Sequence, residues 1–249
     1  MKNTYEEFKK DIVFIGGPCA VEDEQTLYDI AVAVKKRGAT ALRAGAFKPR
    51  TSPYDFQGLG EDGLKILASV GKKVGIKTVS EITDVRLLSK YADIDILQVG
   101  ARNMQNFALL KELGKTDKPV IIKRGFVNTA EELLLSAEYV LSGGNERVAI
   151  CERGIRTFEN STRFTLDLCS VAALKLKSEL AIIVDPSHAA GDCKIVKSLA
   201  LAAVAAGADG IMTEVHTHPE NALCDGAQAI SPEVFGEIVK AGKAIKKII

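Results

Sequence analysis

The sequence predicts an α/β protein, a single (β/α)8 TIM barrel that spans residues 1–249 as one catalytic domain, and three observations support this. Short apolar runs rich in β-forming residues recur eight times at roughly even spacing. Stretches with the 3.6-residue apolar period of an amphipathic helix separate them. No Pro- or Ser-rich linker interrupts this alternation, which is typical of α/β barrels. A doubly wound open sheet is the structural rival, but no GxGxxG follows the first run.

Each expected strand is one of these apolar runs. The first four are "DIVFIGG" (11–17), "TALRAG" (40–45), "KTVSE" (77–81) and "DILQVG" (95–100). The second four are "PVIIKRG" (119–125), "RVAICERG" (147–154), "AIIVDPSH" (181–188) and "GIMTEVH" (210–216). Their spacing leaves room for a helix or a long loop after every strand.

Helical periodicity is clearest in a few of the intervening stretches. These cover residues 23–38, 60–75, 128–144 and 192–210, and a last helix is expected near 231–249. Thr83-Asp84 and Asn128-Thr129 are start signals, because such side chains cap the first turn of a helix. The expected stop signals are glycines that follow the periodic stretches, namely Gly38, Gly75, Gly143 and Gly207.

Composition and charge exclude several classes of protein. Apolar residues make up 47% and charged residues 26%, which is ordinary for a globular protein. The formal net charge of +1 argues against a general affinity for nucleic acid or for an anionic membrane surface. No apolar run approaches the ~20 residues of a membrane span, and the N-terminus resembles neither a signal nor a transit peptide. The scattered, odd set of five cysteines predicts a reducing compartment, the cytoplasm.

Nearly every expected strand ends in a polar or reactive residue. In a barrel these ends meet at one mouth, where the catalytic site of such enzymes lies. The residues are Cys19, Arg43, Lys48, Glu81, Arg102, Lys123, Arg153, Asp185, His188 and Glu214.

Four of the chemically reactive residues at this mouth predict a metal site. Cys19, His188, Glu214 and Asp225 follow strands one, seven and eight, which are neighbours in a closed barrel. A lone Cys or His at a strand end is more often structural, but four such groups on adjacent strands can reach one ion. One sulfur, one nitrogen and two oxygens suit Mn²⁺, Fe²⁺, Co²⁺ or Zn²⁺ better than Mg²⁺ or Ca²⁺. We therefore expect one divalent metal ion as the cofactor.

A second group at the strand ends is cationic. It comprises Arg43, Lys48, Arg50, Arg102, Lys123 and Arg153. Like charges in one pocket repel, so they need anions to offset them. Salt bridges to neighbouring acids are the alternative for any one of them. Arginine forks and lysine point charges suit phosphate and carboxylate, so the sequence predicts phosphorylated, carboxylated substrates.

Seven blocks of sequence carry a resemblance that covers nearly the whole chain. They are "GGPCAVE" (16–22), "LRAGAFKPRTSPYDFQGLG" (42–60), "QVGARNMQN" (98–106), "IIKRG" (121–125), "CERGIRTF" (151–158), "VDPSHAAG" (184–191) and "EVHTHPENALCDGAQ" (214–228). In this order they resemble the 3-deoxy-D-arabino-heptulosonate 7-phosphate (DAHP) synthases, in the short type I-beta subclass without a regulatory domain. The resemblance implies a transferase that joins phosphoenolpyruvate, erythrose 4-phosphate and water into DAHP and phosphate. This is the first step of the shikimate pathway to aromatic amino acids.

The resemblance also implies roles for individual residues. The divalent metal would be held by Cys19, His188, Glu214 and Asp225. Phosphoenolpyruvate would be bound by Arg43, Lys48, Ala101, Arg102, Lys123 and Arg153. Erythrose 4-phosphate would be bound by Pro49, Arg50, Thr51 and Ser52. The residues expected to take part in the chemistry are Lys48, Lys123, Glu81 and His188.

Other readings of the resemblance stay open. The related 3-deoxy-D-manno-octulosonate 8-phosphate synthases use arabinose 5-phosphate, but "KPRTS" (48–52) resembles the DAHP synthases. A non-catalytic binder of phosphorylated metabolites would be expected to have lost some of these residues. The resemblance implies a homotetramer or homodimer and allows a separate chorismate mutase chain as a partner. Because the expected barrel fills the chain, we expect little feedback inhibition by Phe, Tyr or Trp.

Overall fold

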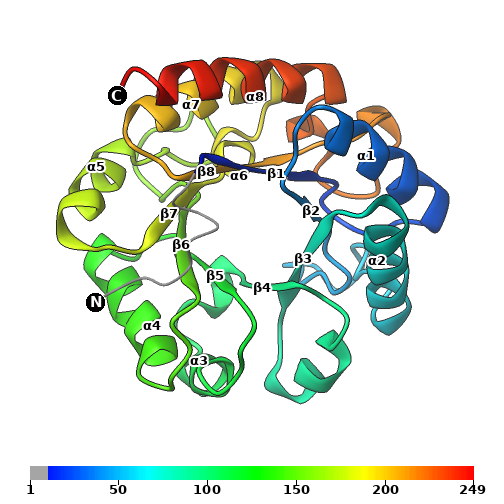
Figure 1. Ribbon diagram of the computed structural model, residues 1–249, viewed down its shortest axis with the longest axis horizontal. Helices are drawn as coiled ribbons and strands as arrows, with labels where there is room; N and C mark the ends of the chain where they lie inside the picture. Colours follow the sequence, from blue (N-terminus) through cyan, green and yellow to red (C-terminus); the bar gives the residue numbers. More distant parts are fainter. Residues whose placement is uncertain (1–10) are drawn as a thin grey trace.

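Eight parallel strands pair edge to edge into a closed barrel, and helices surround them (Figure 1). The structure is a computed structural model that describes residues 11–249. The first ten residues of the expected domain therefore lie outside the described residues. The predicted (β/α)8 barrel is confirmed, and the open-sheet alternative is wrong because β1 pairs with β8.

The strands are short and follow the expected runs closely. Their bounds are β1 Val13–Gly17, β2 Ala41–Arg43, β3 Lys77–Ile82, β4 Ile96–Val99, β5 Val120–Lys123, β6 Val148–Glu152, β7 Ala181–Val184 and β8 Gly210–Glu214. Inward side chains form an apolar core inside the barrel, made of residues such as Ile15, Val79, Ile121 and Ile183. Outward side chains pack against the helices and form the larger core. The charged side chains of the barrel lie at or near the ends of the strands, while uncharged polar residues such as Ser80 and Gln98 also occur within them.

The helices cover the outside of the ring. Their bounds are α1 Glu24–Lys36, α2 Glu61–Val74, α3 Phe107–Leu113, α4 Ala130–Leu141, α5 Leu168–Lys177, α6 Pro186–Ala190, α7 Cys193–Ala205 and α8 Pro232–Lys246. A 3₁₀ helix over Val85–Tyr91 replaces the α-helix after β3, and Asp84 caps its first turn as the sequence indicated. Thr129 caps α4, and Gly75 ends α2 in the left-handed conformation. No helix within residues 11–249 combines the length and apolar character that crossing a membrane requires.

Several expected runs extend past the observed strands, and the largest difference is at the end of β7. The sequence predicted a strand through residue 188, but β7 ends at Val184 and the chain turns into the short helix α6. Pro186 occupies the first turn of α6, where a missing N–H is tolerated. The Asp185 side chain accepts a hydrogen bond from the His188 backbone N–H at 3.0 Å and so caps this helix. His188 is therefore placed by a helical turn and not by a strand.

The end of β1 requires glycine. Gly17 has φ of 152°, and a Cβ there would lie 2.3 Å from the carbonyl oxygen of Arg43 on β2. Any side chain at this position would push the two strands apart. The close approach lets the chain continue directly to Cys19 at the mouth of the barrel.

Replacing Phe14 with Ala is expected to lower the free energy of unfolding by about 3–5 kcal/mol, as is usual for a large buried ring. Phe14 is fully buried, and its ring lies against Gly242 of α8. Urea unfolding would measure the change, with Phe158→Ala as the control, because Phe158 is fully exposed. Equal effects of the two substitutions would contradict this account of the core.

Candidate active site

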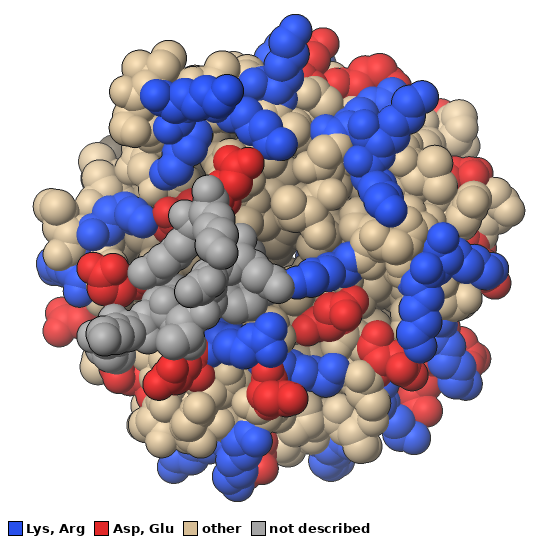
Figure 2. All heavy atoms as spheres, in the orientation of Figure 1, with Lys and Arg blue, Asp and Glu red and all other residues tan. Residues whose placement is uncertain are grey.

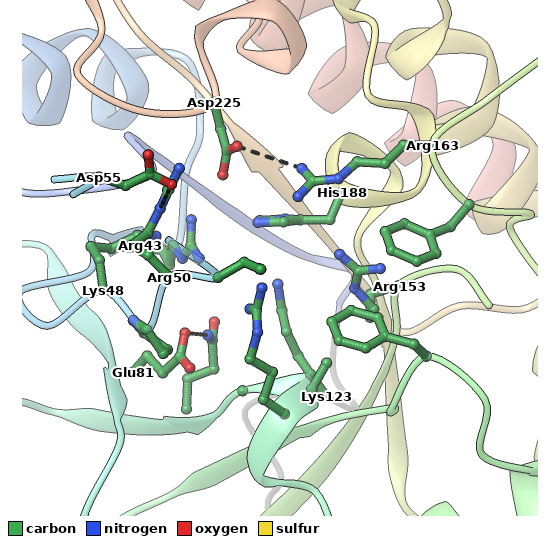
Figure 3. A pocket seen from close by; sticks show the side chains of 18 of the residues that line it. Arg43, Lys48, Arg50, Asp55, Glu81, Lys123, Arg153, Arg163, His188 and Asp225 are labelled. Atoms are coloured by element: carbon green, nitrogen blue, oxygen red, sulfur yellow. Dashed lines mark hydrogen bonds and ion pairs between the residues drawn. The ribbon is translucent and has the colours of Figure 1, made fainter. Parts of the chain in front are cut away.

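A cavity of about 400 Å³ opens at the carboxyl ends of the strands, and the predicted residues converge on it. Figure 3 shows their side chains pointing toward this common space. Among the predicted cationic and metal-type residues, those that line it are Arg43, Lys48, Arg50, Arg102, Lys123, Arg153, His188 and Asp225. Pro49, Thr51, Glu81 and Ala101 line it as well. On the face shown in Figure 2, by contrast, Lys and Arg residues are interspersed with Asp and Glu residues.

The four residues expected to bind a metal lie together. One ligand atom from each of Cys19, His188, Glu214 and Asp225 falls within 4.8 Å of the other three. His188 Nε2 lies 3.3 Å from Glu214 Oε1, and Cys19 Sγ lies 3.1 Å from Asp225 Oδ2. The closure of β8 against β1 produces this arrangement, because Gly17 pairs with Glu214 in the barrel register.

The ionisation of these groups fits a divalent cation. Burial lowers the pKa of His188, so its imidazole is neutral and able to ligate at neutral pH. Burial opposes ionisation of Glu214, but His188 and Arg43 outweigh it and lower its pKa. Burial likewise opposes ionisation of Asp225, but hydrogen bonding from Cys19 and the nearby cations lower its pKa to about 2. A hydrogen bond with Cys224 and burial raise the pKa of the Cys19 thiol, which a bound metal would deprotonate.

Asp185 supports both His188 and Lys123. His188 Nδ1 lies 2.7 Å from Asp185 Oδ2, so it donates its proton there and leaves Nε2 free for a metal. The Lys123 ammonium donates to the same carboxylate oxygen. Burial opposes the charge of Asp185, but these two partners hold its pKa well below the usual range. The sequence placed Asp185 at the mouth but gave it no role in the site.

Two cations lie beside the ligand cluster. Arg43 Nη1 donates to Glu214 Oε1 at 2.9 Å. Lys48 Nζ donates to Cys19 Sγ at 2.8 Å and to the Cys19 carbonyl oxygen at 3.0 Å. Both side chains are buried, so their charges face the cavity and not bulk solvent. A carboxylate in the cavity would meet two cations that are already in place.

Arg153 is the clearest sign of an anion site. Its guanidinium lies between two aromatic rings, 4.9 Å from the centroid of Phe126 and 4.3 Å from that of Phe164. Its Nη1 is buried without a hydrogen-bond partner. Burial lowers the pKa of this guanidinium to about 10. An unsatisfied buried cation is costly, and an anionic ligand in the cavity would satisfy it.

The loop after β2 presents further groups to the cavity. Pro49, Arg50 and Thr51 line it, and Arg50 pairs with Asp55 at 3.4 Å. Ser52 lies in the following turn, where its Oγ accepts from the Tyr54 N–H. Its expected contact with substrate therefore stays a prediction.

Glu81 reaches the cavity through a tight fit. A Cβ at Gly100 would lie 1.9 Å from Glu81 Oε1, so only glycine leaves room for this carboxylate. Gln98 Nε2 lies 3.4 Å from Glu81 Oε2, while Gln98 Oε1 is buried without a partner. Glu81 thereby joins Asp55 and Asp225 as the acidic residues that line a cavity rich in cations.

Sequence reasoning missed several residues of this site. Besides Asp185, they are Gln98, Phe126, Phe164, Arg163 and Gln228. Most belong to loops with no strand-end signal. The single aromatic residue of "TRF" (162–164), Phe164, gave no indication that it would cover Arg153, the residue that follows β6.

Fold and site together define a class: a (β/α)8-barrel enzyme whose mouth joins a metal-type donor set to a cluster of cations. Comparison with known proteins gives the particular family. The chain belongs to the DAHP synthetase I family, whose family model matches residues 8–249.

Similar proteins are known in sequence and in structure. The phospho-2-dehydro-3-deoxyheptonate aldolase of Thermotoga maritima is 50% identical over 232 residues, which cover 93% of this chain and 69% of that protein. The crystal structure of this DAHP synthase superimposes with a TM-score of 0.89 at 49% identity, over 95% of this chain and 69% of that one. A 2-dehydro-3-deoxyphosphooctonate aldolase of Geobacter sulfurreducens is 30% identical, over 96% of this chain and 94% of that protein.

Proposed function

We propose that this protein catalyses the DAHP synthase reaction. Phosphoenolpyruvate, erythrose 4-phosphate and water give DAHP and phosphate, in the first step of the shikimate pathway. The family and the 50% identical relative support this activity. The structural observation that carries it is the buried, unsatisfied Arg153 in a cavity that is also lined by His188 and Asp225, two of the four clustered ligand groups.

One divalent ion, either Mn²⁺, Fe²⁺, Co²⁺ or Zn²⁺, is the proposed cofactor. The donor set that would hold it is Cys19, His188, Glu214 and Asp225. When bound, the ion supplies Lewis-acid chemistry toward the aldehyde oxygen. Asp185 fixes the ring of His188, and Arg43 fixes one carboxylate oxygen of Glu214. These contacts keep the donor groups oriented toward one point.

Phosphoenolpyruvate is proposed to bind across the cationic side of the cavity. Arg43 and Lys48 bind its carboxylate, because both cations are buried beside each other at the end of β2. The phosphate site consists of Arg102, Lys123, Arg153 and the backbone at Ala101. Arg153 offers a planar fork that suits two phosphate oxygens at once.

Erythrose 4-phosphate is proposed to bind at the loop after β2. Arg50 and Thr51 bind its phosphate, with Pro49 and Ser52 shaping the loop. Pro49 restricts the backbone of Lys48, so the two cations of this segment can serve different substrates. Holding both anionic reactants in register can lower a barrier by roughly 7–11 kcal/mol.

The proposed chemistry leaves proton handling to a few side chains. Carbon 3 of phosphoenolpyruvate forms a bond with the aldehyde carbon, water adds at carbon 2, and the C–O bond to phosphate breaks. Lys123 can hold a proton at Nζ near the departing phosphate, since Asp185 stabilises its charge. Glu81 lines the cavity and is the first candidate for the general base that activates the attacking water. His188 is a further candidate.

The test of this function is phosphate release from phosphoenolpyruvate with erythrose 4-phosphate, run in parallel with arabinose 5-phosphate. We expect fast release with the four-carbon sugar, loss of activity after EDTA and recovery on adding Mn²⁺. Preference for the five-carbon sugar would favour the octulosonate synthase reaction, which the name of the 30% identical relative keeps as the second candidate. Phosphate release that is unchanged after EDTA treatment would contradict the proposed role of the metal in the reaction.

Three further proposals concern the setting of the enzyme. The whole chain, residues 1–249, serves as one catalytic domain. The five free cysteines suit a reducing cytoplasm, where thiol ligands survive. A homodimer or homotetramer, and association with a separate chorismate mutase chain, stay predictions that size-exclusion chromatography with light scattering would test.

A further inference from the structure

The loop after β8 carries Asp225 in a backbone conformation that is rare for residues with a side chain. Asp225 has φ of 56° and ψ of 24°, and among residues 11–249 it is the one non-glycine residue with positive φ. Such a conformation costs of order 1–3 kcal/mol and persists where the surroundings fix it. The contacts that hold this loop therefore decide where the carboxylate points.

Arg163, in the loop after β6, makes two of these contacts, and Figure 3 shows its guanidinium pointing at Asp225. Its Nη1 lies 3.5 Å from Asp225 Oδ1 and donates to Gln228 Oε1 at 2.9 Å. Gln228 is buried and its Nε2 donates to Glu214 Oε2 at 2.6 Å. Because the arginine takes the amide oxygen, the amide nitrogen of Gln228 is turned toward the carboxylate.

The backbone of Arg163 is fixed to the helix that carries His188. The Arg163 N–H donates to the Ala190 carbonyl oxygen at 3.1 Å, and the next N–H donates to the Ala189 carbonyl oxygen at 2.9 Å. Gly191 makes this docking possible, since a Cβ there would lie 2.7 Å from the Cβ of Arg163. The base of the arginine thus moves with α6, while its tip lies on the loop after β8.

We propose that Arg163 is a positioning residue that fixes three metal-binding groups, His188, Glu214 and Asp225, relative to one another. The inference rests on the metal site of the proposed function. Both contacts are made by one nitrogen, Nη1, whose two N–H bonds lie in the fixed plane of the guanidinium and can point at Asp225 and at the amide oxygen of Gln228. Partners of this kind typically change metal affinity by 10- to 100-fold when removed.

The test is Mn²⁺ binding to EDTA-stripped protein without substrates, followed by the electron paramagnetic resonance signal of free Mn²⁺. We expect the Kd for Mn²⁺ to rise about 10- to 100-fold in Arg163→Gln and also to rise in Arg163→Lys, which keeps the charge but not the planar guanidinium that directs Nη1. Arg156→Gln is the matched control, because Arg156 comes from the same loop and lines the same cavity. The backbone and the guanidinium of Arg156 contact Phe126. The Kd of the Arg156→Gln variant for Mn²⁺ should therefore stay within about twofold of the wild-type value.

A double variant tests whether Arg163 acts by positioning the metal-binding groups through Gln228 or only through its positive charge. If Arg163 acts through Gln228, the double variant Arg163→Gln/Gln228→Ala should raise the Kd by less than the product of the two single effects. With Co²⁺, the thiolate charge-transfer band should persist at saturation in all variants, since Cys19 is untouched. Urea midpoints identify any variant that fails to fold, and Arg163→Lys then decides the question.

Several outcomes would overturn the inference. A Kd within twofold of wild type in both Arg163 variants would remove the positioning role. If the wild-type protein bound neither Mn²⁺ nor Co²⁺, the proposed metal site would be refuted together with the role of Arg163. Wild-type protein that binds metal but releases no phosphate with either sugar would refute the proposed reaction alone, and the Kd values would still decide the role of Arg163.

Discussion

Replacing Cys19 with Ala is expected to abolish metal-dependent turnover while the barrel stays folded. Cys19 supplies the sulfur among the four clustered ligand groups. The charge stabilisation that a bound ion provides is worth several kcal/mol, so we expect a fall in kcat of about 10³-fold or more. Phosphate release and bound-metal content, measured on the same preparation, would check this.

Matched variants make the result specific. Cys169→Ala removes an exposed thiol and should keep both metal and activity. His188→Ala should behave like Cys19→Ala, because the two residues belong to the same cluster. Full activity in either ligand variant would refute the metal assignment, and a large drop in the urea midpoint would show that the loss came from unfolding instead.

Replacing Arg153 with Met is expected to have opposite effects on activity and on stability. Losing one partner of a buried charge pair costs about 2–5 kcal/mol, so kcat/KM for phosphoenolpyruvate should fall about 30- to 4,000-fold. We expect the free protein to resist urea better, because burial opposes the charge of Arg153 and lowers its pKa to about 10, so Met removes a charge that is costly to bury. Met keeps an apolar chain between the rings of Phe126 and Phe164.

The opposite signs make this prediction easy to refute. A stability that falls together with activity would mean that Arg153 is structural. Arg86→Met is the control, because Arg86 is an exposed arginine of the 3₁₀ helix after β3. It should change neither quantity measurably.

The fold and the ligand cluster could be predicted because both follow from order along the chain. Eight alternating runs define a barrel, and closure makes the ends of β7, β8 and β1 neighbours wherever their side chains point. Cys19, Glu214 and Asp225 could therefore be grouped without coordinates. The same reasoning placed Arg153 at the mouth.

The missed residues depend on side-chain directions, which periodicity does not carry. Asp185 was expected to end a strand, but it caps α6, and only that turn brings its carboxylate to His188 and Lys123. Arg163 reaches Asp225 from a loop without regular structure. Such contacts are set by loop conformation, which single-sequence patterns describe poorly.

The seam between β1 and β8 also has a consequence for how the enzyme comes into being. Cys19 and Asp225 are 206 positions apart, and their side chains touch across that seam. A ribosome must therefore release almost the entire polypeptide before the donor set can exist, and contacts this remote in sequence form late and slowly. Metal binding would therefore report a late step of folding, because the complete donor set forms only after β8 has paired with β1.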